Sequence, residues 1–183
     1  MWMPERKSLD EKLAERGLET GESVYLYRII DAPSDVIWKA ISRPGQLAQY
    51  HPYCQSNEAF KWPGVGARDG LTYYSGIYFE RDFKTWMEGV GYDLEIGSPP
   101  RKTSWISWRI KPLEQSRSNL SIEVTPYLES HLLDVVKLEF QRQYFGKSVE
   151  IYLDSLLRGV DYFVTTGRAV QAKQFGSHPI YAP

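Results

Sequence analysis

The middle of the chain, from Asn57 to Pro126, alternates apolar and polar residues in short runs that are separated by Gly, Pro and Asn residues. The clearest apolar sets are Val90, Tyr92, Leu94 and Ile96; Ile106, Trp108 and Ile110; and Leu120, Ile122 and Val124. A period of two residues predicts antiparallel strands with one covered and one wet face. The segment from Leu71 to Phe79 reads as a further strand that is covered on both faces, because aromatic residues fall on both sides.

Near the C-terminus the period changes to that of a helix. Between Lys147 and Gly167, apolar residues recur three and four positions apart, and charged residues fill the opposite side. The apolar stripe consists of Val149, Tyr152, Leu153, Leu156, Leu157, Val160, Phe163 and Val164. We expect this helix to begin before Glu139, which makes it much longer than the average of about 11–12 residues. Gly146 is predicted to bend it and Gly167 to end it.

The region before the alternating runs predicts one strand and two short helices. Residues 24–30 are rich in β-branched and aromatic residues, which favour a strand. Pro33 suits the first turn of a helix over residues 34–42, because that position needs no N–H donor. A Pro44-Gly45 break then separates this helix from a second one over residues 46–50.

The first 22 residues read as a separate helical extension. Ser8 and Glu11 have the spacing of a capping box, and Gly17 is placed to close the helix. The extension has only a thin apolar stripe, so it can dock on a larger body but not fold alone. Residues 23–183 are predicted to form one domain that ends in a C-terminal tail.

The order of the elements indicates an α+β fold. A long amphipathic helix must bury its stripe, and the largest apolar surface available to it is the covered face of the sheet. We therefore expect a curved antiparallel sheet wrapped around the C-terminal helix, with the two short helices closing one end. A ligand would bind between helix and sheet, provided that side chains do not fill that space completely.

Several sequence features together resemble the SRPBCC superfamily of START-like, helix-grip proteins, which includes the birch pollen allergen and polyketide cyclases. These features are Ile30-Asp31-Ala32-Pro33 with Ile37-Trp38, then Tyr50-His51-Pro52, the Gly64-Val65-Gly66 turn, the strand pattern and the final helix. The resemblance covers roughly residues 23–167. It implies a helix-grip fold with a hydrophobic cavity, but a fold does not determine a function.

Composition and charge exclude some classes of function and indicate a cellular compartment. The 183 residues carry 22 basic and 23 acidic side chains, a balance that argues against nucleic-acid binding. Aromatic residues make up 14%, and such side chains suit either a core or the wall of a cavity. The charged start does not resemble a signal peptide and no run is long enough to span a membrane, so we expect a cytoplasmic protein. The single cysteine, Cys54, fits a reducing compartment.

The candidate ligand-binding residues come from elements that should converge on the cavity. Tyr50, Tyr73, Trp108 and Tyr152 combine a flat apolar body with a polar edge, and Leu156 lies on the helix stripe. His51 is the best candidate for acid–base chemistry, because an imidazole titrates near neutral pH. The alternative for His51 is a structural hydrogen bond to its own loop, and the alternative for each aromatic residue is core packing.

Motifs of established chemistry are missing. The glycine-rich segment from Gly64 to Gly70 lacks the lysine of a phosphate loop, and it reads as a hairpin turn. The three histidines are scattered, and His51 with Cys54 has no second pair to complete a metal site. No nucleophile elbow is present. We therefore predict no catalytic residue, no metal and no cofactor.

Three hypotheses of function remain. The leading one is the binding of a small hydrophobic molecule, such as a lipid, polyketide or aromatic metabolite, in the internal cavity. The second is a polyketide cyclase or aromatase, which can work by positioning and one or two acid–base groups. The third is a protein-interaction module in which the N-terminal helix and residues 168–183 dock a partner or a second copy, giving a homodimer.

Overall fold

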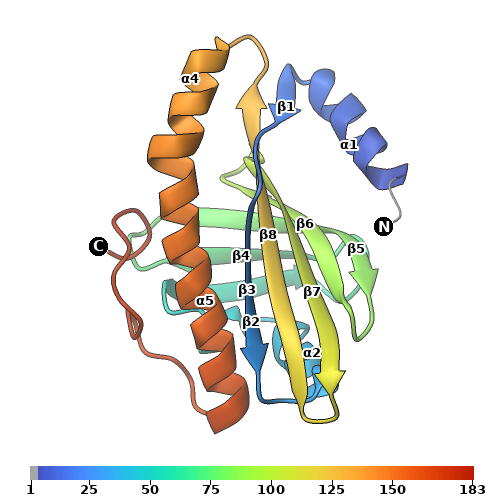
Figure 1. The fold of residues 1–183 in the computed structure, drawn as a ribbon, viewed down its shortest axis with the longest axis vertical. Helices are drawn as coiled ribbons and strands as arrows, with labels where there is room; N and C mark the ends of the chain where they lie inside the picture. Colours follow the sequence, from blue (N-terminus) through green and yellow to red (C-terminus); the bar gives the residue numbers. More distant parts are fainter. Residues whose placement is uncertain (1–3) are drawn as a thin grey trace.

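Eight strands form one open antiparallel sheet in this computed structural model, which describes residues 4–183. The strands are β1 (Leu18–Thr20), β2 (Val24–Ile30), β3 (Cys54–Lys61), β4 (Arg68–Tyr73), β5 (Tyr78–Met87), β6 (Gly91–Gly97), β7 (Ser104–Glu114) and β8 (Arg117–Glu129). Their order is β1-β8-β7-β6-β5-β4-β3, with β2 also paired to β8. In Figure 1, β7 and β8 run along the molecule whereas β3 and β4 run across it, so the sheet curls strongly.

The helices lie before, between and after the strands. They are α1 (Pro4–Ala14), α2 (Ser34–Ile41), α3 (Leu47–Tyr50), α4 (Asp134–Glu139), the π-helical turn η1 (Phe140–Phe145) and α5 (Gly146–Thr166). Helix α5 packs on the inner face of the sheet and against β2, while α1 stands on the other side (Figure 1). This arrangement is the predicted α+β helix-grip fold.

The predicted stripe of α5 supplies the contact with the sheet. Leu153, Leu156, Leu157 and Val160 are buried, as are the inward residues of β6, β7 and β8. Gly159 lets α3 approach, because a Cβ at this position would lie 1.9 Å from the carbonyl oxygen of Tyr50. Gly167 ends the helix in the left-handed conformation, at φ 68°, as predicted.

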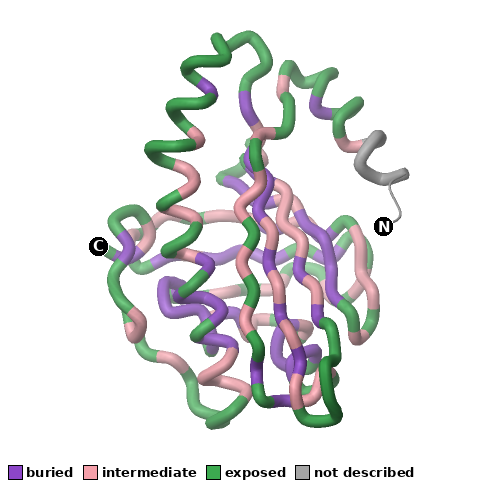
Figure 2. The backbone as a smooth tube through the Cα atoms, viewed as in Figure 1, coloured by how far each residue is buried: buried purple, intermediate pink, exposed green. Residues whose placement is uncertain are grey.

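The terminal helix begins before Glu139, as expected, and changes its winding near its start. Residues 134–139 are α-helical and the turn over 140–145 is π-helical, ending at Gly146. Figure 2 shows that this first part projects beyond the sheet and is largely exposed, whereas the buried residues concentrate farther along α5. The interior therefore lies against the second half of the helix.

Two predicted boundaries were wrong. Leu71 to Phe79 is not one strand, because the chain turns between β4 and β5, where the Tyr73 N–H donates to the Ile77 carbonyl at 2.9 Å. Gly76 adopts a positive φ of 85°, and the tight turn that this allows overrides the strand propensity of the flanking tyrosines. Helix α1 begins at Pro4, so Ser8 lies inside the helix and not at its start. Residues 1–3 of the predicted extension lie outside the described residues.

The C-terminal tail, residues 167–183, lies across its own domain. Backbone N–H groups of Val170 and Lys173 donate to the carbonyls of Gln49 and Pro52, at 2.9 and 3.0 Å. His178 and Ala182 are fully buried. The tail therefore covers the end of the molecule where α3, β4 and α5 meet.

Candidate functional site

The space between the sheet and α5 is almost filled by side chains. The remaining internal cavity measures about 20 Å³, which is enough for roughly one water molecule. It is lined by Leu47, His51, Leu71, Arg81, Leu94, Ile96, Ile106, Trp108, Ile122, Tyr152, Leu153 and Leu156. A ligand of drug or lipid size fits only if these side chains move.

The structure brings most of the predicted site residues to this cavity. His51, Trp108, Tyr152 and Leu156 line it. Tyr73 is one step away, with its hydroxyl 2.9 Å from that of Tyr152. Tyr50 is fully buried but does not line the cavity, and its ring lies 6.2 Å from the ring of Phe163 on α5. A ligand-binding role for these six residues stays a prediction.

A chain of hydrogen bonds links the polar edges of three of these side chains. The Tyr53 N–H donates to Nδ1 of His51 at 3.2 Å, so Nδ1 carries no proton and Nε2 does. The Nε2–H of His51 then donates to the Tyr152 hydroxyl at 2.6 Å, and Tyr152 bonds Tyr73. Because the Tyr53 donor is a backbone group, it fixes the tautomer of His51.

This hydrogen-bond chain has more donor protons than hydrogen bonds. His51 Nε2–H, Tyr152 O–H and Tyr73 O–H are three donors, but the described residues show only two bonds among them. One tyrosine hydroxyl proton is therefore left to donate elsewhere. When Tyr73 donates to Tyr152, the surplus proton lies on Tyr152, which lines the cavity, and an oxygen acceptor placed there would meet this donor.

Burial keeps the three side chains of this hydrogen-bond chain uncharged. Desolvation, followed by the nearby positive charge of Arg81, lowers the pKa of His51 to about 3. Desolvation likewise raises the pKa values of Tyr73 and Tyr152 well above the usual value for tyrosine. At neutral pH the site therefore presents a neutral imidazole and two protonated phenols.

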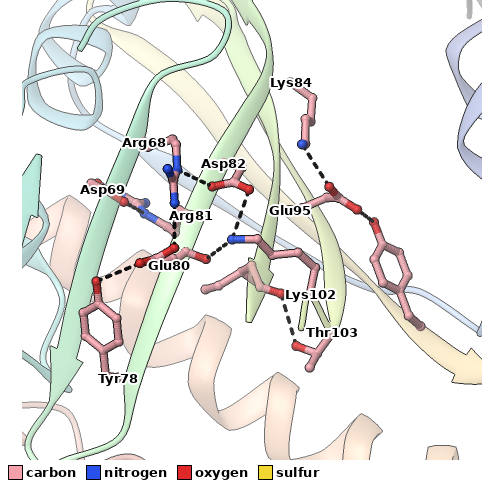
Figure 3. Close-up of polar contacts among 12 residues, drawn as sticks. Arg68, Asp69, Tyr78, Glu80, Arg81, Asp82, Lys84, Glu95, Lys102 and Thr103 are labelled. Atoms are coloured by element: carbon pink, nitrogen blue, oxygen red, sulfur yellow. Dashed lines mark hydrogen bonds and ion pairs between the residues drawn. The ribbon is translucent and has the colours of Figure 1, made fainter. Parts of the chain in front are cut away.

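Sequence reasoning missed a buried ion pair beside the same cavity, between Arg81 and Asp69. Arg81 donates to both carboxylate oxygens of Asp69, at 2.8 and 2.5 Å, and Asn57 donates to the same carboxylate at 3.0 Å. Figure 3 shows Arg81 and Asp69 facing each other across β4 and β5. The alternation held the necessary information, because Arg81 shares a strand face with Phe79 and Phe83, and Asp69 shares one with Ala67 and Leu71.

The tail covers the outer side of the tyrosine pair. The ring of Tyr181 lies 4.4 Å from that of Tyr73 and 5.1 Å from that of Tyr152, between ring centroids. The carbonyl of Tyr181 accepts from the Ser75 N–H at 3.0 Å, which fixes the tail to the turn after β4. His178 donates through Nε2 to the carbonyl of Ser148 at 3.0 Å, because its Nδ1 accepts backbone N–H groups of the tail.

Other chemistry finds little support among the described residues. No group of three His, Cys, Asp or Glu side chains within residues 4–183 is arranged to hold a metal ion. Burial raises the pKa of the Cys54 thiol to about 12, so this cysteine is a poor nucleophile. None of the described helices is both long and apolar enough to cross a bilayer. Arg109 lies on the outer face of β7, where it pairs with Asp93 at 2.7 Å.

Comparisons with known proteins inform the fold. No family model matches the sequence, and the comparison with curated proteins gives no significant match. A START superfamily protein from Mycobacterium smegmatis superposes with a TM-score of 0.60 at 15% identity, over 79% of this chain and 98% of that one. Ara h 8.0201 superposes with a TM-score of 0.59 at 16% identity, over 82% and 99%.

A third structure belongs to a larger protein. The di-domain ARO/CYC BexL from the BE-7585A biosynthetic pathway superposes with a TM-score of 0.63 at 10% identity, over 79% of this chain. The match spans 47% of BexL, so this chain corresponds to about half of that protein. These likenesses show that the chain shares the helix-grip fold of these proteins. Identities this low carry no information on activity.

Proposed function

We propose that this helix-grip protein binds a small, largely apolar molecule that carries one oxygen acceptor, in the space between the sheet and α5. The observation that carries the proposal is the surplus hydroxyl proton of the His51–Tyr152–Tyr73 hydrogen-bond chain, beside a lining whose other side chains are apolar except for Arg81. A buried donor without a partner is costly, and a carbonyl, hydroxyl or carboxylate oxygen of a ligand would satisfy it.

The cavity volume adds a requirement to this proposal. With about 20 Å³ of free space, the side chains leave no room for such a ligand, so the ligand must displace them to enter. Tyr181 is the best placed to move, because it lies on the tail and covers Tyr73 and Tyr152 from outside. Binding is therefore expected to loosen the tail while α5 keeps its apolar contacts.

The cyclase alternative is less well supported than ligand binding. A general base needs a free lone pair that faces the substrate, but Nδ1 of His51 accepts the Tyr53 N–H and Nε2 carries the proton. The proposal thus assigns His51 to ligand orientation through Tyr152.

The proposal also places the protein in the cytoplasm and includes no nucleic-acid partner.

The experiment measures binding of the neutral dye N-phenyl-1-naphthylamine, together with native mass spectrometry of the purified protein for a co-purified molecule. We expect saturable dye binding that Leu156→Phe abolishes, because the larger ring occupies the cavity. Ile151→Phe is the matched control, since Ile151 is exposed on the same helix. Absence of both a co-purified molecule and saturable binding would contradict the proposal, as would equal dye binding in the two variants.

A further inference from the structure

A second and much larger space lies on the opposite face of the sheet, under the N-terminal helix. It is an open groove of about 510 Å³ between α1 and the outer surfaces of β5, β6 and β7. This volume is within the range of small-molecule sites, about 300–1,000 Å³. In Figure 1, α1 stands beside this outer face at the edge away from α5.

Local features of the strands turn the groove residues outward. Trp105 and Glu95 are direct partners on neighbouring strands, and each alternates with residues that face the interior of the fold. A bulge between Phe83 and Thr85 leaves Lys84 without a partner in the register. Such a bulge re-aims side chains, and here both Lys84 and Thr85 line the groove.

The charged groups of the groove have an excess of positive charge. Glu95 pairs with Lys84 at 3.0 Å and with Arg16 at 3.6 Å, so two cations share one carboxylate (Figure 3 shows Lys84 and Glu95). Lys12 and Glu15, both on the α1 side, also line the groove. Counting all five, three cations face two carboxylates.

Apolar surface accompanies this charge. The half-buried indole of Trp105 lies on the strand side, where its Nε1–H donates to the Ser107 hydroxyl at 3.2 Å and so orients the ring. Leu9 contributes from α1. The long stems of Lys84 and Arg16 extend the apolar surface, since such side chains bury their methylenes while the charge stays in water.

We infer that this outer groove is a second binding site, which takes a flat, largely apolar small molecule with one anionic group. The aromatic body would lie on Trp105, and the anion would pair with Lys84 and Arg16, which Glu95 alone does not neutralise. The site is separate from the internal cavity, because the strand residues of the groove and those of the cavity lie on opposite faces of the sheet.

The test compares two dyes with the same aromatic skeleton. 8-Anilinonaphthalene-1-sulfonate carries a sulfonate, and N-phenyl-1-naphthylamine does not. We expect the sulfonate dye to bind through the groove and Lys84→Gln to raise its Kd by about tenfold, the loss of one charge-assisted contact. Trp105→Ala should raise it by a similar factor through lost stacking. Lys111→Gln, an exposed lysine farther along β7, is the matched control and should leave the Kd unchanged.

The variants also separate this site from the internal one. Leu156→Phe, which fills the internal cavity, should leave the Kd of the sulfonate dye unchanged. Loss of sulfonate-dye binding in Leu156→Phe alone would overturn the outer site, as would Kd values in both Lys84→Gln and Trp105→Ala within twofold of the parent protein. Circular dichroism checks that Trp105→Ala folds, and Lys84→Gln, at a partly exposed side chain, decides the question if it does not.

Discussion

The two faces of the sheet are covered by helices whose apolar stripes differ greatly in width, and the free volumes beneath the two helices differ accordingly. Under α5 the free volume is about 20 Å³, whereas under α1 it is about 510 Å³. Helix α5 places a broad apolar stripe on the sheet, but α1 offers little more than Leu13, which is fully buried, and Leu9. A wide stripe fills its face of the sheet, and a thin one docks at a point and leaves a groove.

The polar groups of the two spaces also differ in their exposure to water. Inside, charges and hydroxyls are withdrawn from water and bond one another, so each is costly to disturb. Outside, the charges of the groove remain partly exposed, where an ion pair contributes little to stability. The inner site should therefore respond to substitution through folding, and the outer groove through binding.

The largest effect is expected from breaking the buried ion pair. Arg81→Leu leaves the Asp69 carboxylate buried without its charged partner, which should lower the free energy of unfolding by about 3–5 kcal/mol in urea denaturation. The double variant Asp69→Leu with Arg81→Leu should recover most of this loss. Arg68→Leu removes an exposed arginine from the neighbouring strand and should change stability far less. Equal losses in Arg68→Leu and Arg81→Leu would refute the contrast.

Enlarging the inner cavity should come next. Leu156→Ala removes a buried side chain that lines the cavity, and we expect a loss of roughly 2–5 kcal/mol together with stronger binding of N-phenyl-1-naphthylamine. Ile151→Ala, on the exposed side of the same helix, should show neither effect. A stability loss without any gain in dye binding would mean that the site collapses instead of opening.

A graded effect is expected from pH. The pKa of His51 is about 3 in the folded protein, against 6.5 for a histidine in water, so below pH 6.5 the unfolded chain binds a proton that the folded one does not. Stability should thus fall as the pH falls, by roughly 1.4 kcal/mol per pH unit, until the folded pKa is reached.

Urea denaturation between about pH 4 and pH 7 measures this slope. His51→Gln should flatten it, with a remainder from His178, whose pKa burial also lowers. An unchanged slope in His51→Gln would show that other groups control the acid sensitivity.

The smallest effect on stability is expected at the outer groove. Lys84→Gln removes one of two cations from Glu95 at a side chain that is 40% exposed, so the free energy of unfolding should change by less than about 1 kcal/mol. Thermal melting checks this value beside the tenfold change in dye affinity. A larger loss of stability would mean that Lys84 holds α1 or the bulge in place.

Much of the fold could be predicted because its patterns are local. The alternation around Leu94, Trp108 and Ile122 marked the inner face, and the 3.6-residue period marked α5. The turn between β4 and β5 was missed, since the aromatic residues around Gly76 suit a strand as well as a turn. The division into an extension over 1–22 and one domain over 23–183 stays a prediction.

The candidate site was predicted less completely. Tyr152 and Leu156 could be placed because a helix stripe must face the sheet, and Trp108 because strand alternation points it inward. Arg81 and Asp69 were overlooked, because a charged side chain on an apolar strand face can be interpreted only when its partner on the neighbouring strand is known. The outer groove could not be foreseen, because it depends on where α1 docks.

By itself, the sequence determined which residues turn toward the interior, because the periods of strand and helix fix the side of each element on which a residue lies. Only the tertiary structure decided how much room remained between those elements, which polar groups met, and that the wider space lies outside the sheet. Free volume and hydrogen-bond partners arise from contacts between segments distant in the chain, and the local pattern of residues carries no record of those distances.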